Sequence, residues 1–295
     1  MQLVSVIVPT YRRLDSLKKA LQSLSEQTYP NFEIIVIDDN DDAEWNASVS
    51  KIVSDFCSKH PSISLTYIAN HPNQGSAKSR NIGIERARGT FVTFLDDDDL
   101  YLPNKISRQA VFMEDSHCDY SITDLFLYNE HDRLIDQRIR SYIQDTSQSH
   151  LQEYHLKYHM TGTDSLMFKR DYLLQIGGFA PIDAGDEYYL MQRAIDGDGK
   201  FGYLSGCDIK AYVHTGEGGL SSGDIKINGE NALFDFKKNY FSQISAATKR
   251  YITMRHYAVL AYAELRRNHF ISFLQYSLSS FFRSPIDCIR LFLFR

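Results

Sequence analysis

The chain has 295 residues, 43% of them hydrophobic, which is enough apolar material for a sizeable core. Its net charge of −5 argues against a nucleic-acid-binding protein, and the absence of any run of about 18 apolar residues argues against a transmembrane helix. The four cysteines form no CxxC or zinc-like pattern, and the N-terminus does not have the pattern of a signal peptide. We therefore expect a cytoplasmic protein with free thiols.

Short apolar segments alternate with helical patterns over the first 117 residues. Strands are expected at 4–8, 32–37, 65–69 and 91–95, with helices near 17–24, 48–58 and 77–87. This alternation predicts an α/β fold with a mostly parallel central sheet and helices on both faces. In such sheets, ligands bind beyond the carboxyl ends of the strands.

After residue 118 the pattern is mixed. The expected elements are strands at 166–168, 201–203 and 211–213, helices at 171–176 and 188–195, and a mobile Gly- and Ser-rich loop at 215–229. From about residue 230 the pattern is helical. We therefore divide the chain into an α/β domain over 1–229, with halves at 1–117 and 118–229, and a helical C-terminal region over 230–295.

Four consecutive aspartates, Asp96 to Asp99, follow the fourth predicted strand. Like charges this close raise one another's pKa values unless a cation is present. Mg²⁺ and Mn²⁺ prefer hard oxygen ligands such as these carboxylates. A solvated acidic loop or a helix N-terminus would explain the run equally well on its own. Its place at the end of an apolar strand favours the metal site.

A set of short motifs runs in a fixed order through residues 3–220. In chain order they are Ser5-Val-Ile-Val-Pro-Thr-Tyr11, Ile37-Asp-Asp-Asn40, Asn73-x-Gly75, Ser79-Arg-Asn81-x-Gly83, Phe94-Leu-Asp-Asp-Asp-Asp-x-x-x-Pro103, Phe168-Lys-Arg…Gly177-Gly-Phe179 and Gly185-Asp-Glu187. Each motif is weak singly, but the ordered set resembles the family 2 inverting glycosyltransferases with the GT-A fold. The resemblance implies a transferase that uses a nucleotide-diphosphate sugar as its donor, with residues 1–117 as the nucleotide-binding half and 118–229 as the acceptor and catalytic half.

The resemblance also implies which residues hold the donor. Those expected at the nucleotide are Pro9, Thr10, Tyr11, Arg13, Asp39, Lys78, Arg80, Asp96 and Asp97. Asp39 would accept a hydrogen bond from a uracil edge, which favours a UDP-sugar. Asp96 and Asp98 match the DxD motif of the family, and Asp98 is the expected direct ligand of Mn²⁺ or Mg²⁺. Asp96 and His214 are further metal candidates, although a packed or surface histidine would explain His214 as well.

Asp186 begins a predicted helix, where an acidic side chain is favoured by the helix dipole alone. The resemblance aligns it with the catalytic base, and Glu187 is the neighbouring rival. An inverting transfer needs one carboxylate to take the proton of the acceptor hydroxyl. The leaving nucleoside diphosphate needs no protein acid when a metal neutralises its charge. We further expect Glu217 and Ser221 to line a loop that closes over the donor.

The end of the chain is basic and aromatic. Residues 249–295 carry a net charge of +6, which leaves −11 for the rest of the chain. Phe270, Phe273, Leu274, Phe281 and Phe282 recur at helical spacing within it. Such an amphipathic segment can lie in a membrane interface, or it can bury its apolar face against the body or a second subunit. The chain is thus expected to act on the cytoplasmic side, with peripheral membrane contact or homo-oligomer formation as open possibilities.

The function expected from these features is metal-dependent, inverting sugar transfer to a saccharide or lipid-linked saccharide in cell-surface polysaccharide biosynthesis. A sugar-nucleotide nucleotidyltransferase is the enzymatic alternative, but the stretch Pro9 to Arg13 lacks the glycine-rich phosphate loop of that class. A non-catalytic nucleotide-sugar-binding protein is the third possibility. The presence of both the aspartate run and Asp186 argues against it.

Overall fold

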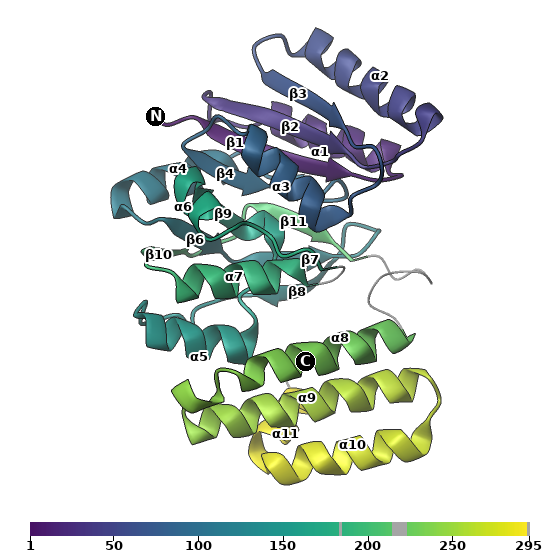
Figure 1. Ribbon diagram of the computed structural model, residues 1–295, viewed down its shortest axis with the longest axis vertical. Helices are drawn as coiled ribbons and strands as arrows, with labels where there is room; N and C mark the ends of the chain where they lie inside the picture. The colour runs from purple at the N-terminus through teal and green to yellow at the C-terminus, as the bar shows by residue number, and fades with distance from the viewer. Residues whose placement is uncertain (183–184, 214–222, 294–295) are drawn as a thin grey trace. The chain divides into compact units, whose positions relative to one another are not determined.

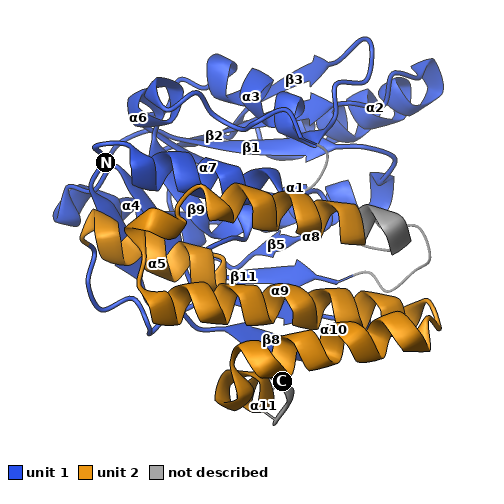
Figure 2. Cartoon of the chain, turned by 60° about the horizontal axis from the view of Figure 1, so that its bottom comes forward, with its two compact units in different colours: residues 1–146, 160–213 blue, residues 147–159, 214–295 orange. Residues whose placement is uncertain are grey.

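A computed structural model describes residues 1–182, 185–213 and 223–293 of the chain. The residues divide into two compact units (Figure 2). Unit 1 comprises residues 1–146 and 160–213, and unit 2 comprises residues 147–159 and 214–295. The sequence placed the boundary at 229/230 and did not foresee that an internal segment groups with the C-terminal helices.

Unit 1 is built on a sheet that has seven strands among the described residues (Figure 1). Its strands, in spatial order, are β10 (Phe201–Leu204), β6 (Tyr120–Thr123), β9 (Leu166–Lys169), β4 (Phe91–Phe94), β1 (Val4–Thr10), β2 (Phe32–Asp38) and β3 (Ser64–Ala69). Neighbouring strands are parallel except around β9, which runs antiparallel to both β4 and β6. The expected mostly parallel sheet is confirmed.

Helices cover both faces of this sheet, as predicted. In unit 1 they are α1 (Leu14–Ser25), α2 (Ala43–Lys59), α3 (Ser76–Arg86), α4 (Lys105–Ser116), α6 (Arg170–Gln175) and α7 (Asp186–Asp196). Val4, Val6 and Val8 of β1 share a buried core with Leu17 of α1 and Val49 of α2. The intervening residues of β1 point to the other face because side chains alternate along a strand. There, α3 packs against β1 and β2.

Unit 1 also has a smaller sheet with four described strands. It consists of β5 (Leu100–Tyr101), β11 (Ile209–Tyr212), β7 (Leu125–Tyr128) and β8 (Leu134–Arg138), in that spatial order. Its strand β5 is the next strand after β4 in the sequence. A single 3₁₀ turn, η1 (Thr163–Ser165), leads directly into β9. Because β9 is antiparallel to β4, its first residues lie at the edge where β4 ends. This topology brings η1 to the predicted ligand edge.

Unit 2 is helical. Its elements are α5 (Gln148–Tyr158), α8 (Gly223–Lys238), the 3₁₀ turn η2 (Phe241–Gln243), α9 (Ala246–Arg266), α10 (Phe270–Arg283) and α11 (Pro285–Leu293). Leu156, Ile244 and Ile252 form its buried apolar cluster. The expected loop at 215–229 is partly wrong, because α8 begins at Gly223. His214, Glu217 and Ser221 lie outside the described residues.

Candidate active site

The carboxyl ends of β1, β2 and β4 place the predicted polar residues at one edge of the sheet. Asp97 follows β4 and is buried, with only 4% of its surface exposed. Its Oδ2 accepts hydrogen bonds from the Thr10 hydroxyl at 2.8 Å and from the Tyr11 amide at 3.3 Å, and Arg13 Nη1 lies 3.0 Å from Oδ1. The structure therefore joins four residues that the resemblance assigned to the nucleotide.

Arg13 also reaches the neighbouring carboxylate, because its Nη1 lies 2.7 Å from Asp98 Oδ2. Burial raises the pKa of Asp97 to about 6, although Thr10 and Arg13 act in the opposite direction. The half-exposed Arg13 is thus the cation that faces two of the four aspartates. Arg13 lies between β1 and α1, at the N-terminal end of α1.

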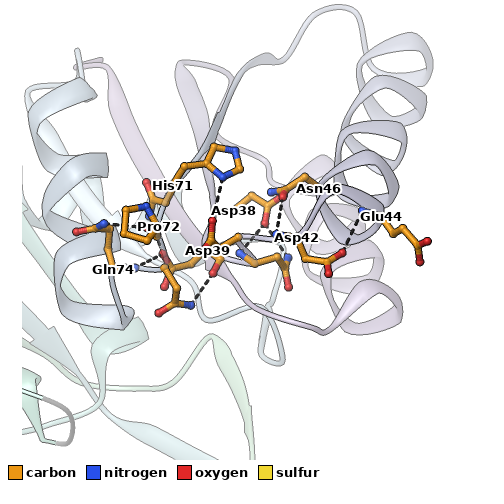
Figure 3. Close-up of polar contacts among 12 residues, drawn as sticks. Asp38, Asp39, Asp42, Glu44, Asn46, His71, Pro72 and Gln74 are labelled. Carbon is orange, nitrogen blue, oxygen red and sulfur yellow. Dashed lines mark hydrogen bonds and ion pairs between the residues drawn. The ribbon is translucent and has the colours of Figure 1, made fainter.

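Asp39 holds a loop in this structure. Its Oδ1 accepts hydrogen bonds from the Asn70 amide group and from Gln74 N, both at 2.8 Å, and its Oδ2 accepts one from Gly75 N at 2.8 Å (Figure 3). The neighbouring Asp38 accepts hydrogen bonds from Asn46 of α2 at 2.9 Å (Figure 3) and from the Tyr67 hydroxyl of β3 at 2.7 Å. Asp39 shapes the segment before α3, and its contact with a uracil base stays a prediction.

Arg80 of α3 links two acidic positions that lie far apart in the sequence. Its Nη1 is 2.8 Å from Asp186 Oδ2, and its Nη2 is 2.6 Å from Asp96 Oδ1. Arg80 is 5% exposed and Asp186 is 7% exposed. Burial lowers the pKa of Arg80, but the two carboxylates outweigh it and raise the pKa above its ordinary value. Arg80 thus forms a buried double ion pair, and its expected contact with a base or phosphate stays a prediction.

Asp186 is the first residue of α7, which follows Gly185 in the left-handed conformation at φ 75°. The carboxylate oxygen of Asp186 that does not contact Arg80, Oδ1, accepts a hydrogen bond from Glu187 N at 3.0 Å. Burial, followed by the neighbouring Asp186, raises the pKa of Glu187 to about 7. Asp186 is held in place by the Arg80 guanidinium, whereas the carboxyl group of Glu187 keeps part of its protons near neutral pH.

A third acidic position, Asp164 of η1, was not foreseen. Carboxylate oxygens of Asp96, Asp99 and Asp164 lie within 4.8 Å of one another. Asp164 Oδ1 accepts a hydrogen bond from Asp96 N at 2.8 Å, and Asp99 Oδ1 accepts one from Tyr212 N at 2.7 Å. Burial, followed by the charge of Asp96, raises the pKa of Asp164 to about 7, and burial together with Asp164 raises that of Asp99.

These three residues fit a divalent cation. They offer hard carboxylate oxygens that lie close together, and burial with the neighbouring carboxylates raises the pKa values of Asp99 and Asp164. The sequence had named Asp96, Asp98 and His214 for this role. Asp96 belongs to the cluster, Asp98 pairs with Arg13 instead, and His214 lies outside the described residues. Pro9 borders the site in β1, and Lys78 is exposed on α3.

Comparisons with known proteins bear on the family and the fold of the chain. The family model described as Glycosyl transferase family 2 matches residues 5–176, which is more than half of the chain. The Escherichia coli protein WfaP, a UDP-Glc:alpha-D-GlcNAc-diphosphoundecaprenol beta-1,3-glucosyltransferase, is 33% identical over 128 residues, or 43% of this chain and 47% of WfaP. The chain spans less than two thirds of the length of the first curated relatives that it matches.

Two solved structures share the fold. S. aureus TarS 1-349 in complex with UDP-GlcNAc aligns with a TM-score of 0.60 at 18% identity, covering 96% of this chain and 92% of that chain. The mannosyltransferase PcManGT from Pyrobaculum calidifontis, in complex with GDP-Man and Mn2+, aligns with a TM-score of 0.62 at 16% identity, covering 99% and 78%. At these identities the likeness establishes a GT-A-like fold and no more.

Proposed function

Since the chain belongs to glycosyltransferase family 2, we propose that it moves one sugar, with inversion, from a UDP-sugar to a saccharide or lipid-linked saccharide acceptor. The glycosyltransferase activity itself follows from the family. The UDP-sugars in the names of WfaP and the TarS complex support the donor. The diphosphoundecaprenol acceptor of WfaP supports a lipid-linked acceptor and a place in cell-surface glycan synthesis.

The observation that carries this proposal is the buried bridge through Arg80, which joins Asp186 to the aspartate run. An inverting transfer requires a base close to the diphosphate of the donor, and this bridge supports Asp186 and the aspartate run in those two roles. The oxygen of the acceptor hydroxyl attacks the anomeric carbon while the bond from that carbon to the diphosphate oxygen breaks. Asp186 takes the hydroxyl proton. The nucleoside diphosphate leaves with the bonding electron pair, and Arg13 lies where it can balance part of that charge.

A divalent cation fits the cluster of Asp96, Asp99 and Asp164. Asp98 lies outside this cluster and pairs with Arg13. Bound there, Mn²⁺ or Mg²⁺ would supply Lewis-acid stabilisation of the diphosphate. The Mn²⁺ in the PcManGT complex supports this assignment. The remaining work falls to residues of the chain: Asp97 and Thr10 order the end of β1, and Asp39 orders the loop before α3.

The test separates proton transfer from donor binding. Asp186→Asn removes the base but keeps the size of the side chain, so we expect kcat to fall by about 10²–10⁴ while UDP affinity in the presence of Mn²⁺ changes little. Asp98→Ala, which removes a partner of Arg13, should lower both kcat and the affinity for UDP. Asp171→Asn, an exposed acid in the first turn of α6, is the matched control.

The donor is found by screening nucleotide sugars for hydrolysis and transfer with Mn²⁺ and with Mg²⁺. Release of a nucleoside diphosphate is expected. Release of pyrophosphate would instead identify a nucleotidyltransferase. Normal turnover by Asp186→Asn would remove the base assignment, whatever the donor proves to be.

A further inference from the structure

Helix α10 exposes one continuous apolar stripe. The large apolar side chains that lie mainly in solvent are Phe270, Ile271, Leu274, Leu278, Phe281 and Phe282. At about 100° of rotation per residue, they fall within an arc of roughly 120°. The exposed fraction reaches 78% for Ile271 and 76% for Phe282. A contiguous exposed patch of this kind marks an interaction site.

The opposite side of α10 is where a surface helix normally keeps its apolar residues. Here, small polar residues occupy part of it. Ser280 is 1% exposed and donates its hydroxyl hydrogen bond to the carbonyl oxygen of Met254 in α9 at 2.9 Å. The hydroxyl oxygen of Ser277 is also buried. The inner side of α10 thus combines these serines with the partly buried Phe273 and Tyr276, and the exposed apolar stripe lies on the other side of the helix.

Further exposed apolar residues lie on α11, which begins one residue after the end of α10. Ile286 and Ile289 are 67% and 50% exposed, whereas Cys288 between them is buried. A hollow of about 450 Å³ opens beside the stripe and is lined by Tyr257, Leu278, Ser279, Phe282 and Arg283. It combines apolar walls with one cationic edge. We call the exposed apolar residues of the two helices the outer face of α10 and α11.

Charge identifies what this face meets. Residues 265–286 contain no aspartate or glutamate, and Arg266, Arg267, Arg283 and Arg290 flank the stripe. Apolar side chains with arginines at their borders match the boundary between acyl chains and headgroups of an anionic bilayer. We propose that the outer face of α10 and α11 binds the surface of an anionic lipid membrane, with the helices lying in the interface plane.

A second copy of the chain is the less suitable occupant. Two such faces would bring together two segments that each carry a net charge of +6 over residues 249–295, and like charges disfavour that contact. Within the described residues, no helix combines the length and the apolar character needed to cross a bilayer. The proposal is therefore surface binding, and it goes beyond the sugar transfer without depending on the identity of the donor.

Flotation of the full chain with vesicles tests the proposal. We expect it to float with vesicles of phosphatidylcholine and phosphatidylglycerol, and less with phosphatidylcholine alone or at high salt. Ile271→Ser, Leu274→Ser and Phe282→Ser combined should lower the partition coefficient about tenfold or more, because three apolar side chains that would insert into the membrane are lost. Leu134→Ser with Ile135→Ser, exposed apolar residues of β8 in unit 1, should leave it unchanged.

Arg283→Gln with Arg290→Gln should remove the preference for anionic lipid.

A fluorescence reporter separates contact from misfolding. Trp45 is the only tryptophan, so Trp45→Phe with Phe282→Trp reports on the outer face alone. Its emission should shift to shorter wavelength on adding anionic vesicles, while a Trp45→Phe, Ile135→Trp chain should not respond. The proposal is overturned if the wild type stays with the lipid-free fraction or if the serine variants float equally well. It is also overturned if the face is occupied by a second copy, seen as a dimer that those variants dissociate.

Discussion

At the scale of single residues, Arg80 is the centre of the site. It is buried, and its two terminal nitrogens each contact a carboxylate, Asp96 on one side and Asp186 on the other. The double ion pair holds both carboxylate groups in fixed positions and thereby fixes the direction of the Asp186 side chain. The contact of Arg80 with a base or phosphate, which the family resemblance implied, stays a prediction.

We expect Arg80→Gln to lower kcat, because Asp186 and Asp96 lose the cation that holds their carboxylate groups in place. Arg80→Lys keeps the charge but can satisfy only one partner well, so it should restore part of kcat. Arg108→Gln, which breaks an ion pair with Asp208, should leave kcat unchanged. A wild-type kcat in Arg80→Gln would show that Asp186 does not need this cation.

The metal assignment gives a second prediction, because the structure and the family motif favour different aspartates. Asp164→Asn removes one charge from the cluster with Asp96 and Asp99, so we expect Mn²⁺ affinity to fall about 10- to 100-fold. Titration calorimetry with Mn²⁺ and UDP measures this change. Asp119→Asn, at the opposite end of the sheet, is the control. If Asp164→Asn bound Mn²⁺ as tightly as the wild type, Asp164 would not be a metal ligand, and Asp96 and Asp98 would remain the candidates.

At the scale of elements, the first half of unit 1 followed from sequence pattern. The buried strands β1, β2 and β4 are short apolar runs with polar residues directly after them, and a parallel sheet must bring such ends to one edge. Asp164 could not be found in this way. It precedes a strand, and a residue before a strand reaches the same edge only when that strand is antiparallel. The pattern of Leu166 to Phe168 predicts a strand but not its direction.

The helical elements show the same limit. The helical character of α9 and α10 follows from their sequence, but the grouping of α5 with them does not. That grouping depends on contacts between distant residues, such as Glu153 of α5, which accepts hydrogen bonds from Ser245 N at 2.8 Å and from the Thr248 hydroxyl at 3.0 Å. Local periodicity carries no information about such pairings.

The packing of α3 on β1 gives a prediction at this scale. A methyl group at Gly83 would lie 2.5 Å from Cγ2 of Ile7, so Gly83→Ala overpacks the contact and should destabilise the protein by about 1–3 kcal/mol. Urea unfolding measures the loss. Ile7→Val in the same chain should recover little of it, because it removes only Cδ1, 3.1 Å from the added methyl group, and keeps Cγ2. Gly229→Ala in α8 meets no atom within 4 Å and is the control.

At the scale of the whole molecule, stability is linked to proton and cation binding at the site. Burial raises the pKa of Asp97 to about 6 and those of Asp164 and Glu187 to about 7. In the unfolded chain these groups ionise near pH 4. The folded state therefore binds more protons than the unfolded state between about pH 4 and 7, and its stability falls as pH rises through that window.

We accordingly expect the cation-free protein to have a lower Tm at about pH 7 than at about pH 5, because each unit of raised pKa costs about 1.4 kcal/mol once the group ionises. Lys105, whose pKa burial lowers to about 7, gives the opposite slope only above that pH, so it does not mask the effect. Mn²⁺ should raise Tm at pH 7 and do little at pH 5, where protons occupy the carboxylates that it needs. Asp164→Asn should reduce both the change of Tm with pH and the rise of Tm on adding Mn²⁺. If Tm with EDTA were constant from pH 5 to 7, the acidic cluster would be ionised without cost, and the argument for a cation there would lose its physical basis.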